Sequence, residues 1–205
     1  MKRKIMALLT AMMLMVSAVP VHAAAANVTK KMSGDRDLKQ VSEMFAAYTT
    51  AMNLSGNISG GQVEIPLNGA NQLSIGAFVR YNYKDDFGFT ARELKRETKD
   101  LFGKAAKVNV LKKTGQEDML VCAADRSFAN DPYMYCGGDF SDCIPQYKIK
   151  KVVQIKKNLY RVEIQNKMGI YGENGSEDMG STVLKVKKDK DSVYGYVVKE
   201  VSYKK

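Results

Sequence analysis

The sequence predicts an α+β protein in which N-terminal helices pack on a curved, mostly antiparallel C-terminal β-sheet. Apolar residues recur every three or four positions between residues 38 and 52, as they do on the buried stripe of a helix. After residue 147 the apolar residues alternate with polar ones in runs rich in Val, Ile and Tyr, which is typical of strands. Because the helical patterns precede the strand patterns, we expect the two kinds of element to be segregated in space. Another α+β meander is the alternative.

The first 23 residues have the organisation of a secretory signal peptide. Three basic residues at positions 2–4 precede the apolar run 5–16, and small residues surround a cleavage site near Ala23. Pro20 follows the apolar run and no basic stop-transfer cluster comes after it, so we expect no membrane span. The sequence therefore predicts a protein that is secreted or associated with the cell envelope.

The remaining chain is predicted to form one domain. Removal of 23 residues from 205 leaves 182, enough to bury a core without a second domain. Residues 24–34 are small, polar and basic, so we expect a flexible tail there. The single α+β domain then covers 35–205, with a helical part at 35–103 and a sheet part at 107–205.

The first helix has the clearest signal in the chain. Asp35 is its expected N-cap and Asn53 to Gly56 its stop. Its apolar stripe is more often protein core than a cofactor pocket. The stripe consists of Leu38, Val41, Met44, Phe45, Tyr48, Ala51 and Met52.

Residues 55–72 are rich in Gly and Asn and are expected to be loop, with a short strand at Val63 to Ile65. The run Leu73 to Lys84 fits the period of a strand and that of a helix, so periodicity leaves both open.

A helix from Ala91 to Phe102 is predicted by the capping box that begins at Thr90 and by Gly103, a suitable left-handed C-cap. We expect Leu94, Leu101 and Phe102 to be buried. Glu93 is expected to pair with Glu97 and Arg96 across the wet face of this helix.

Everything after this helix is predicted to be strand and turn. The last four strands are joined by short connections, which indicates an antiparallel meander with one wet face. On the second of them, Tyr160, Val162 and Ile164 should face inward. The expected strands are Lys107 to Leu111, Met119 to Ala124, Tyr133 to Cys136, Tyr147 to Ile155, Leu159 to Gln165, Thr182 to Lys187 and Tyr194 to Tyr203.

The order of a long helix, a shorter helical hairpin and a curved antiparallel sheet resembles the nuclear-transport-factor-like or cystatin-like cone of small exported bacterial proteins. The resemblance covers residues 36–205 and is carried by the phrases at 90–95, 101–104 and 194–198. It implies a helix at Leu73 to Lys84 and a sheet wrapped round a pocket that binds small ligands or proteins, and only sometimes serves an enzyme. Enzymatic members usually have Asp and His in that pocket.

The positive charge is concentrated in the last third of the chain. Subtracting the three basic residues of the leader from the formal net charge of +10 leaves +7; residues 148–205 carry 14 basic and 7 acidic side chains, while residues 24–147 are balanced. A basic face attracts polyanions, and an anionic cell-wall polymer is the expected partner if the patch binds anything; nucleic acid is not expected. A lysine-rich solvated surface is the other interpretation. The patch contains Lys148, Lys150, Lys151, Lys156, Lys157, Arg161, Lys185, Lys187, Lys188 and Lys190.

The three cysteines allow one disulfide, which an exported compartment permits. Cys136 and Cys143 flank a short polar stretch, so a bridge between them would contribute about 2 to 3 kcal/mol. Cys122 lies in an apolar run and is expected to be a buried thiol. The acidic residues around the cysteine loop match no calcium-loop spacing, so no metal and no cofactor is predicted.

The only histidine, His22, lies in the leader. Ser-His-Asp and Cys-His catalysis and imidazole zinc sites are therefore not expected in the mature protein, and no catalytic residue is predicted. The leading hypothesis is an exported, non-enzymatic binding module with a pocket between the helices and the concave sheet. The alternatives are retention on anionic wall polymer through the basic sheet, and a histidine-free enzyme that uses a carboxylate or lysine.

Overall fold

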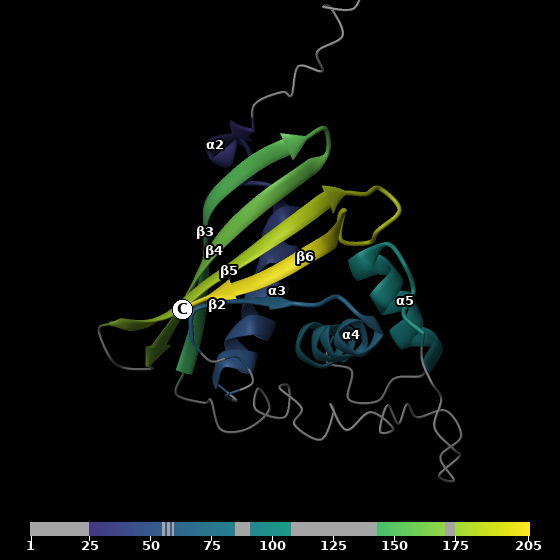
Figure 1. The fold of residues 1–205 in the computed structure, drawn as a ribbon, viewed down its shortest axis with the longest axis horizontal. Coiled ribbons are helices and arrows are strands. Elements are labelled where there is room, and N and C mark those ends of the chain that lie inside the picture. The colour runs from purple at the N-terminus through teal and green to yellow at the C-terminus, as the bar shows by residue number, and fades with distance from the viewer. Residues whose placement is uncertain are drawn as a thin grey trace, which may run out of the picture.

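The structure, a computed structural model, describes residues 25–54, 56, 58, 60–84, 91–107, 143–170 and 175–205. Six strands within these residues form one antiparallel sheet in the order β1-β3-β4-β5-β6-β2. The last four strands form a meander at its centre, and two short N-terminal strands form its edges (Figure 1). The strands are β1 (Ala26–Asn27), β2 (Gln62–Ile65), β3 (Cys143–Lys156), β4 (Leu159–Ile170), β5 (Ser176–Lys188) and β6 (Tyr196–Lys204).

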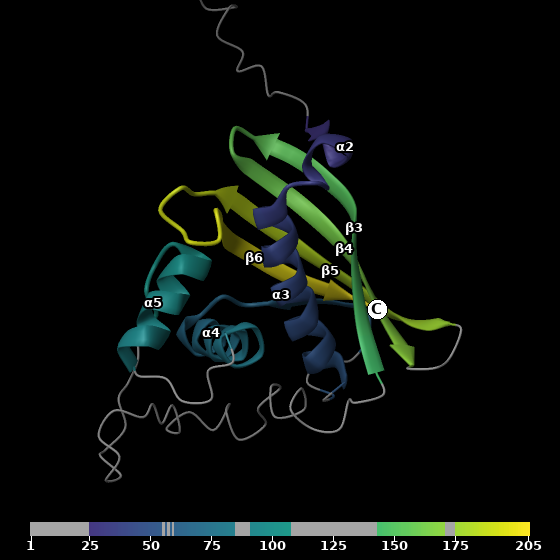
Figure 2. The same ribbon diagram turned by 180° about the vertical axis from the view of Figure 1, so that it is seen from behind.

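The helices cover one face and one side of this sheet. The long helix α3 crosses the face that is turned to the viewer in Figure 2 and contacts β3, β4, β5 and β6. Helices α4 and α5 pack on each other beside the end of the sheet formed by β2 and β6. The predicted α+β class is therefore confirmed. The helices are α2 (Thr29–Met32), α3 (Arg36–Leu54), α4 (Gly69–Tyr83) and α5 (Ala91–Phe102).

Helix α3 begins as the sequence predicts. The Asp35 carboxylate accepts a hydrogen bond from the Leu38 backbone N–H at 2.9 Å, the contact by which an aspartate caps a helix. Its other oxygen accepts from the Tyr196 hydroxyl at 3.1 Å, which attaches the start of α3 to β6. The apolar stripe of α3 is buried against the sheet apart from Met52, which is half-buried.

Aromatic contacts extend the core from α3 to the other two helices. Phe45 meets Phe102 of α5 edge to face, with ring centroids 6.0 Å apart. Tyr48 meets Phe78 of α4 in the same way at 5.5 Å. These pairs add about 0.5–1.5 kcal/mol each beyond the burial of their apolar area, so α3 holds the sheet and both flanking helices together.

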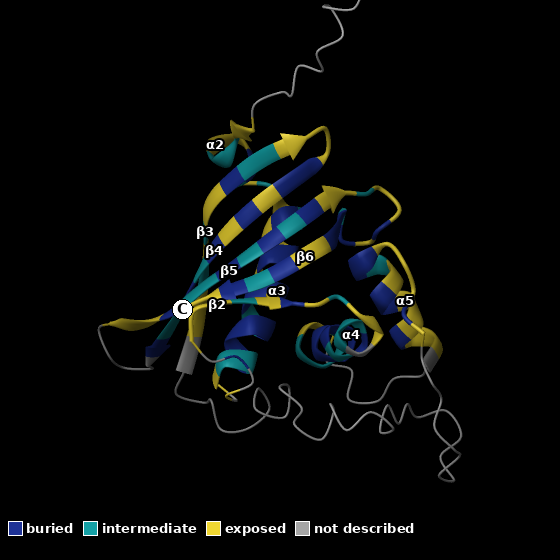
Figure 3. Cartoon of the chain, viewed as in Figure 1, coloured by how far each residue is buried: buried dark blue, intermediate teal, exposed yellow. Residues whose placement is uncertain are grey.

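The predicted alternation along the meander is confirmed. Tyr160, Val162 and Ile164 are buried, whereas Arg161 and Glu163 between them are exposed, and Figure 3 shows the same alternation along the neighbouring strands. The inward residues face α3. The opposite face of β4, β5 and β6 carries no helix in the described part of the chain, and we call it the open face (Figure 1).

A buried polar cluster joins α3 to two strands. Thr49 and Thr182 share a hydrogen bond of 2.5 Å, and the Asn166 amide donates to Thr182 at 2.9 Å. All three residues have no exposed surface. Because polar groups in a core cost free energy unless they are paired, the cluster favours one position of α3 on the sheet.

The structure decides between helix and strand for residues 73–84 and shows regular structure before α3. The run Leu73 to Lys84 lies in α4, as the resemblance implies, and Asn68 caps that helix by accepting from the Asn71 N–H at 3.0 Å. The sequence predicts a flexible tail over 24–34; of these residues the structure describes 25–34, and β1 and α2 form there. The Val152 N–H donates to the Thr29 hydroxyl at 2.9 Å, and this edge contact orders the segment. The strands expected between residues 108 and 142 lie outside the described residues.

Candidate functional site

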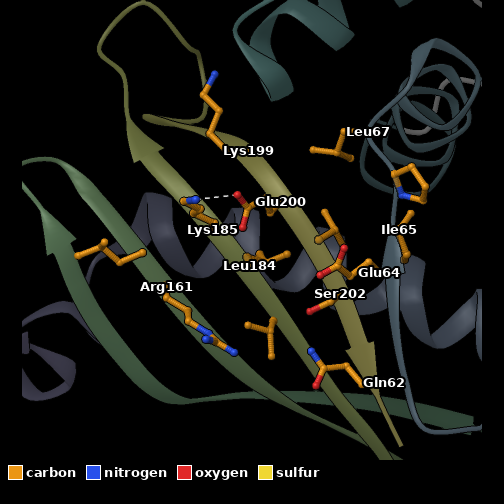
Figure 4. Close-up of a pocket in the computed structure, with 14 residues that line it drawn as sticks. Gln62, Glu64, Ile65, Leu67, Arg161, Leu184, Lys185, Lys199, Glu200 and Ser202 are labelled. Atoms are coloured by element: carbon orange, nitrogen blue, oxygen red, sulfur yellow. Dashed lines mark hydrogen bonds and ion pairs between the residues drawn. The ribbon is translucent and has the colours of Figure 1, made fainter. Parts of the chain in front are cut away.

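Described residues line a hollow on each face of the sheet. The first is a groove of about 500 Å³ on the open face, which we call the open-face groove. Figure 4 shows side chains from β2, β4, β5 and β6 around it, together with Leu67 from the segment that leads to α4. The lining residues are Gln62, Glu64, Ile65, Pro66, Leu67, Ile155, Arg161, Val183, Leu184, Lys185, Lys199, Glu200, Val201 and Ser202.

Strand register places a row of charges across the open-face groove. Arg161 on β4 lies opposite Lys185 on β5, and Lys185 lies opposite Glu200 on β6. The Lys185 ammonium contacts the Glu200 carboxylate at 2.6 Å. Arg161 forms no ion pair with a described residue. Arg161 and Lys185 are therefore neighbouring cations on β4 and β5. Glu200 lies on the other side of Lys185, on β6.

The second hollow lies between the N-terminal half of α3 and the strands β3 and β4. It has a volume of about 420 Å³, and we call it the α3 pocket. Ile149 and Ile164 contribute apolar surface from the sheet, and hydroxyl and charged residues line the rest. The lining residues are Thr29, Ser33, Lys39, Ser42, Glu43, Tyr147, Lys148, Ile149 and Ile164.

Ser42 is the unusual residue of the α3 pocket. It is 1% exposed, and its hydroxyl oxygen has no hydrogen-bond partner among the described residues. A hydroxyl removed from water without a partner costs about 1–3 kcal/mol. Because most buried polar groups in native proteins are paired, an unpaired hydroxyl in the wall of a pocket marks a place where a ligand can complete the hydrogen bonding.

The predicted basic patch divides into three groups. Arg161 and Lys185 lie on the open face, as does Lys151, which lies opposite Glu163; Lys148 lines the α3 pocket, and Lys150 lies on β3. The β3–β4 and β5–β6 turns meet at one end of the sheet, where the Lys188 N–H donates to the Asn158 carbonyl at 2.8 Å. We call the lysines of that end the basic rim. It consists of Lys156, Lys157, Lys187, Lys188 and Lys190.

The tyrosines that accompany these lysines in the sequence do not form an exposed ring surface. Tyr160 is 8% exposed and Tyr194 is 4% exposed. Tyr147 is half-buried and lines the α3 pocket. None of the described residues that line the open-face groove is aromatic, so the described rings near the basic patch are not presented for base stacking.

The expectation that Glu97 lies on the wet face of α5 is wrong. Glu97 is 1% exposed and accepts a hydrogen bond from the buried Tyr194 hydroxyl. Its carboxylate also contacts the Lys84 ammonium at 2.5 Å and the Arg80 guanidinium at 3.6 Å. Position 97 faces α4 and the β5–β6 connection, a tertiary contact that the pattern of α5 alone does not contain.

We call Glu97, Arg80, Lys84, Asp100 and Tyr194 the Glu97 cluster. The pKa values of two of its members are shifted. Burial and the hydrogen bond to Glu97 raise the pKa of Tyr194 far above 10. Burial, followed by the charge of Glu97, raises the pKa of Asp100. None of these residues lines either hollow. The cluster acts as an ionic connection between α4, α5 and the start of β6.

Several predicted features lie outside the described residues. These are His22, Cys122, Cys136 and the capping threonine Thr90; Cys143 begins β3, and the proposed bridge to Cys136 is not described. Within the described ranges, no three His, Cys, Asp or Glu side chains are grouped to hold a metal ion. None of the described helices combines the length and the apolar character needed to cross a membrane.

The most informative residues of both hollows have only weak signals in the sequence. Ser42 follows Leu38 by one helical turn and interrupts the apolar stripe of α3, so a polar residue on a buried stripe was the available signal. Gln62 and Glu64 carried no signal of their own. They reach the open-face groove because β2 pairs with β6, and their nearest partners are about 140 positions away in sequence.

Comparison of the chain with protein-family models, with curated proteins and with solved structures finds no match.

Proposed function

We propose that this chain is an exported, non-enzymatic binding module and that the α3 pocket is its ligand site. The ligand class that fits best is a small amphipathic carboxylate. The observation that carries the proposal is the unpaired, buried hydroxyl of Ser42 in the pocket wall. The leader at 1–23 supports export, because it has the three regions of a signal peptide.

Size and lining support a small ligand. A volume of about 420 Å³ lies within the range of about 300–1,000 Å³ that small-molecule sites occupy. Ile149 and Ile164 would take the apolar part of the ligand. Ser42 would donate its hydroxyl proton to a ligand oxygen, and the bond would offset the cost of burying that hydroxyl.

The charges of the lining favour an anionic head group. Among the described residues that line the pocket, Lys39 and Lys148 are opposed by Glu43 alone. An excess of one positive charge at a half-open site attracts a carboxylate and disfavours a cation. Lys39 and Glu43 lie one turn apart on α3, so their charges are held on the same side of the helix.

Binding is favoured over catalysis because of where the perturbed groups lie. Tyr194 and Asp100, whose pKa values are raised, belong to the Glu97 cluster and line neither hollow. A catalytic acid or base needs to reach the substrate within hydrogen-bond distance. The α3 pocket presents hydroxyls, apolar side chains and three charged residues, a lining that can hold and orient a ligand.

A fluorescence titration tests the proposal. The chain from residue 24 is titrated with 1-anilinonaphthalene-8-sulfonate, an aromatic anion, and the bound probe is displaced with decanoate, decanol or decyltrimethylammonium. We expect decanoate to displace the probe best. Ser42→Ala should weaken decanoate binding about ten- to 150-fold, as expected for one lost hydrogen bond to a charged group. Ile149→Trp should abolish binding by filling the pocket.

Thr50→Val is the matched control. Thr50 is a buried hydroxyl on the same helix, but it donates to the Ala46 carbonyl at 2.8 Å and does not line the pocket. The control should bind decanoate as the natural chain does. Equal displacement by all three decyl compounds, or equal affinity of the natural chain and Ile149→Trp, would contradict the proposal.

A further inference from the structure

We propose that the open face, from the open-face groove to the basic rim, binds a linear polyol-phosphate polymer of the kind that makes up anionic cell walls. This surface is on the opposite side of the sheet from the α3 pocket. The two sites can therefore be tested independently of each other. The partner is inferred from the arrangement of charge and from the non-aromatic character of the described side chains that line the groove.

The row of charges across the groove is arranged to receive an anion. Arg161 and Lys185 lie directly opposite each other on neighbouring strands, and like charges in this position destabilise a sheet. Glu200 neutralises Lys185 at 2.6 Å but forms no ion pair with Arg161. A phosphate between the two cations would relieve their repulsion, and the guanidinium could donate two hydrogen bonds to it.

The cations continue from the groove to one end of the sheet. Lys187 follows Lys185 on the same face of β5, about 6.6 Å further along the strand, and lies opposite Leu159. Lys156 flanks Leu159 on its other side, from β3. A flexible chain with one phosphate per short repeat could thus contact Arg161 and Lys185 first and then the basic rim.

The chemistry around the cations favours a polymer without bases. Proteins that bind single-stranded nucleic acid stack the bases on aromatic side chains, and none of the described residues that line the groove is aromatic. Leu67, Ile155 and Val183 line it instead and can contact the CH groups of a polyol. Lysine, which predominates here, binds phosphate as a point charge and does not require a fixed orientation.

Fluorescence anisotropy with labelled poly(glycerol phosphate) over a series of salt concentrations tests the proposal. We expect binding that weakens as salt rises. The double variant Arg161→Gln/Lys185→Gln should bind about tenfold more weakly at low salt. The slope of log affinity against log salt should be smaller by about 1.4, because two phosphate contacts are lost.

A matched variant separates the site from net charge. Arg92→Gln/Lys95→Gln also removes one arginine and one lysine, from exposed positions of α5. It should keep the affinity and the slope of the natural chain. An equal loss of affinity in both double variants would contradict the assignment of the site to Arg161 and Lys185. The free energy of unfolding is measured for each variant, and that of Arg161→Gln/Lys185→Gln should stay close to that of the natural chain, because removal of the like-charge pair offsets the loss of the exposed Lys185–Glu200 ion pair.

Competition identifies the class of polymer. Unlabelled poly(glycerol phosphate) should displace the label at lower concentration than a single-stranded oligonucleotide or polyglutamate of equal charge, and neutral dextran should not displace it. An oligonucleotide that competes as well as poly(glycerol phosphate) would overturn the polymer class. Binding that does not change between low and high salt would overturn the electrostatic mechanism.

Discussion

Ser42 and Thr50 lie two turns apart on α3 and show how the surroundings of a buried hydroxyl decide its effect. The Thr50 hydroxyl is bonded to the Ala46 carbonyl at 2.8 Å, whereas the Ser42 hydroxyl has no partner among the described residues. A paired hydroxyl contributes modestly to stability, and an unpaired one costs free energy. Retaining an unpaired hydroxyl in a pocket wall is the exchange of stability for binding that functional sites often make.

This contrast predicts opposite effects on stability. Ser42→Ala should raise the free energy of unfolding of the unliganded protein by about 1 kcal/mol, since it removes an unpaired buried group. Thr50→Val should lower it by about 0.5–1.5 kcal/mol, since it breaks a buried hydrogen bond. Urea unfolding of both variants measures the two changes. A loss of stability in Ser42→Ala would mean that the hydroxyl is satisfied in solution.

Glu97 connects three parts of the structure, which are α4, α5 and the residues before β6. Removing one partner of a buried ion pair costs about 3–5 kcal/mol, because the remaining charge loses its compensation. Glu97→Gln should therefore destabilise the protein by an amount near the lower end of that range, since Lys84 is 37% exposed and can reach water. Thermal unfolding of the variant measures the loss.

Glu93→Gln is the control for this prediction. Glu93 contacts the same Arg80 guanidinium at 3.5 Å, but its side chain is 48% exposed. Exposed pairs contribute at most about 1 kcal/mol, so this variant should be close to the natural chain. Equal losses at positions 93 and 97 would contradict the role of Glu97 as the buried connection.

The elements also show what could be predicted from the sequence. Helix α3 and the meander were predictable because each buries one face, which leaves the 3.6- or 2-residue period in the sequence. Helix α4 is buried on several sides between α3 and α5, and consecutive residues 75–79 are all buried. Its period is therefore obscured. The side of α5 that carries Glu97 was misassigned for a related reason, since its partners come from other elements.

At the scale of the whole molecule, three buried tyrosines make the free energy of unfolding depend on pH in the alkaline range. Burial is the main cause that raises the pKa of Tyr194, Tyr196 and Tyr203 above the usual 10. The unfolded chain would lose these protons near pH 10, while the folded chain keeps them. Their contribution is therefore complete below pH 10 and declines as pH rises above it, by up to about 1.4 kcal/mol per pH unit for each tyrosine.

Urea unfolding between pH 9 and pH 11 checks this expectation. Tyr196→Phe should show a shallower decline than the natural chain, because one of the three groups no longer titrates. The lysines are the same in both proteins, so their titration cancels in the comparison. Identical declines in the two proteins would contradict the assignment of Tyr196.

The two candidate sites are properties of the whole molecule, which limits what the sequence could predict of them. The basic residues on the open face and the basic rim could be found from the sequence, because charge can be counted along a chain. The sequence did not indicate that Lys148 lies at one hollow and Arg161 and Lys185 at the other. That separation follows from strand register and from the position of α3, both of which depend on contacts between distant residues.

The most direct test of the α3 pocket as a ligand site is to locate the bound ligand by nuclear magnetic resonance. Decanoate is titrated into the isotope-labelled chain from residue 24, and the shifts of the backbone amides are followed. The amides at 29–43 and 147–149 should shift, and those of the open-face residues 183–185 and 199–202 should stay in place. Shifts confined to the open face, or no saturable shift at 29–43, would contradict the site.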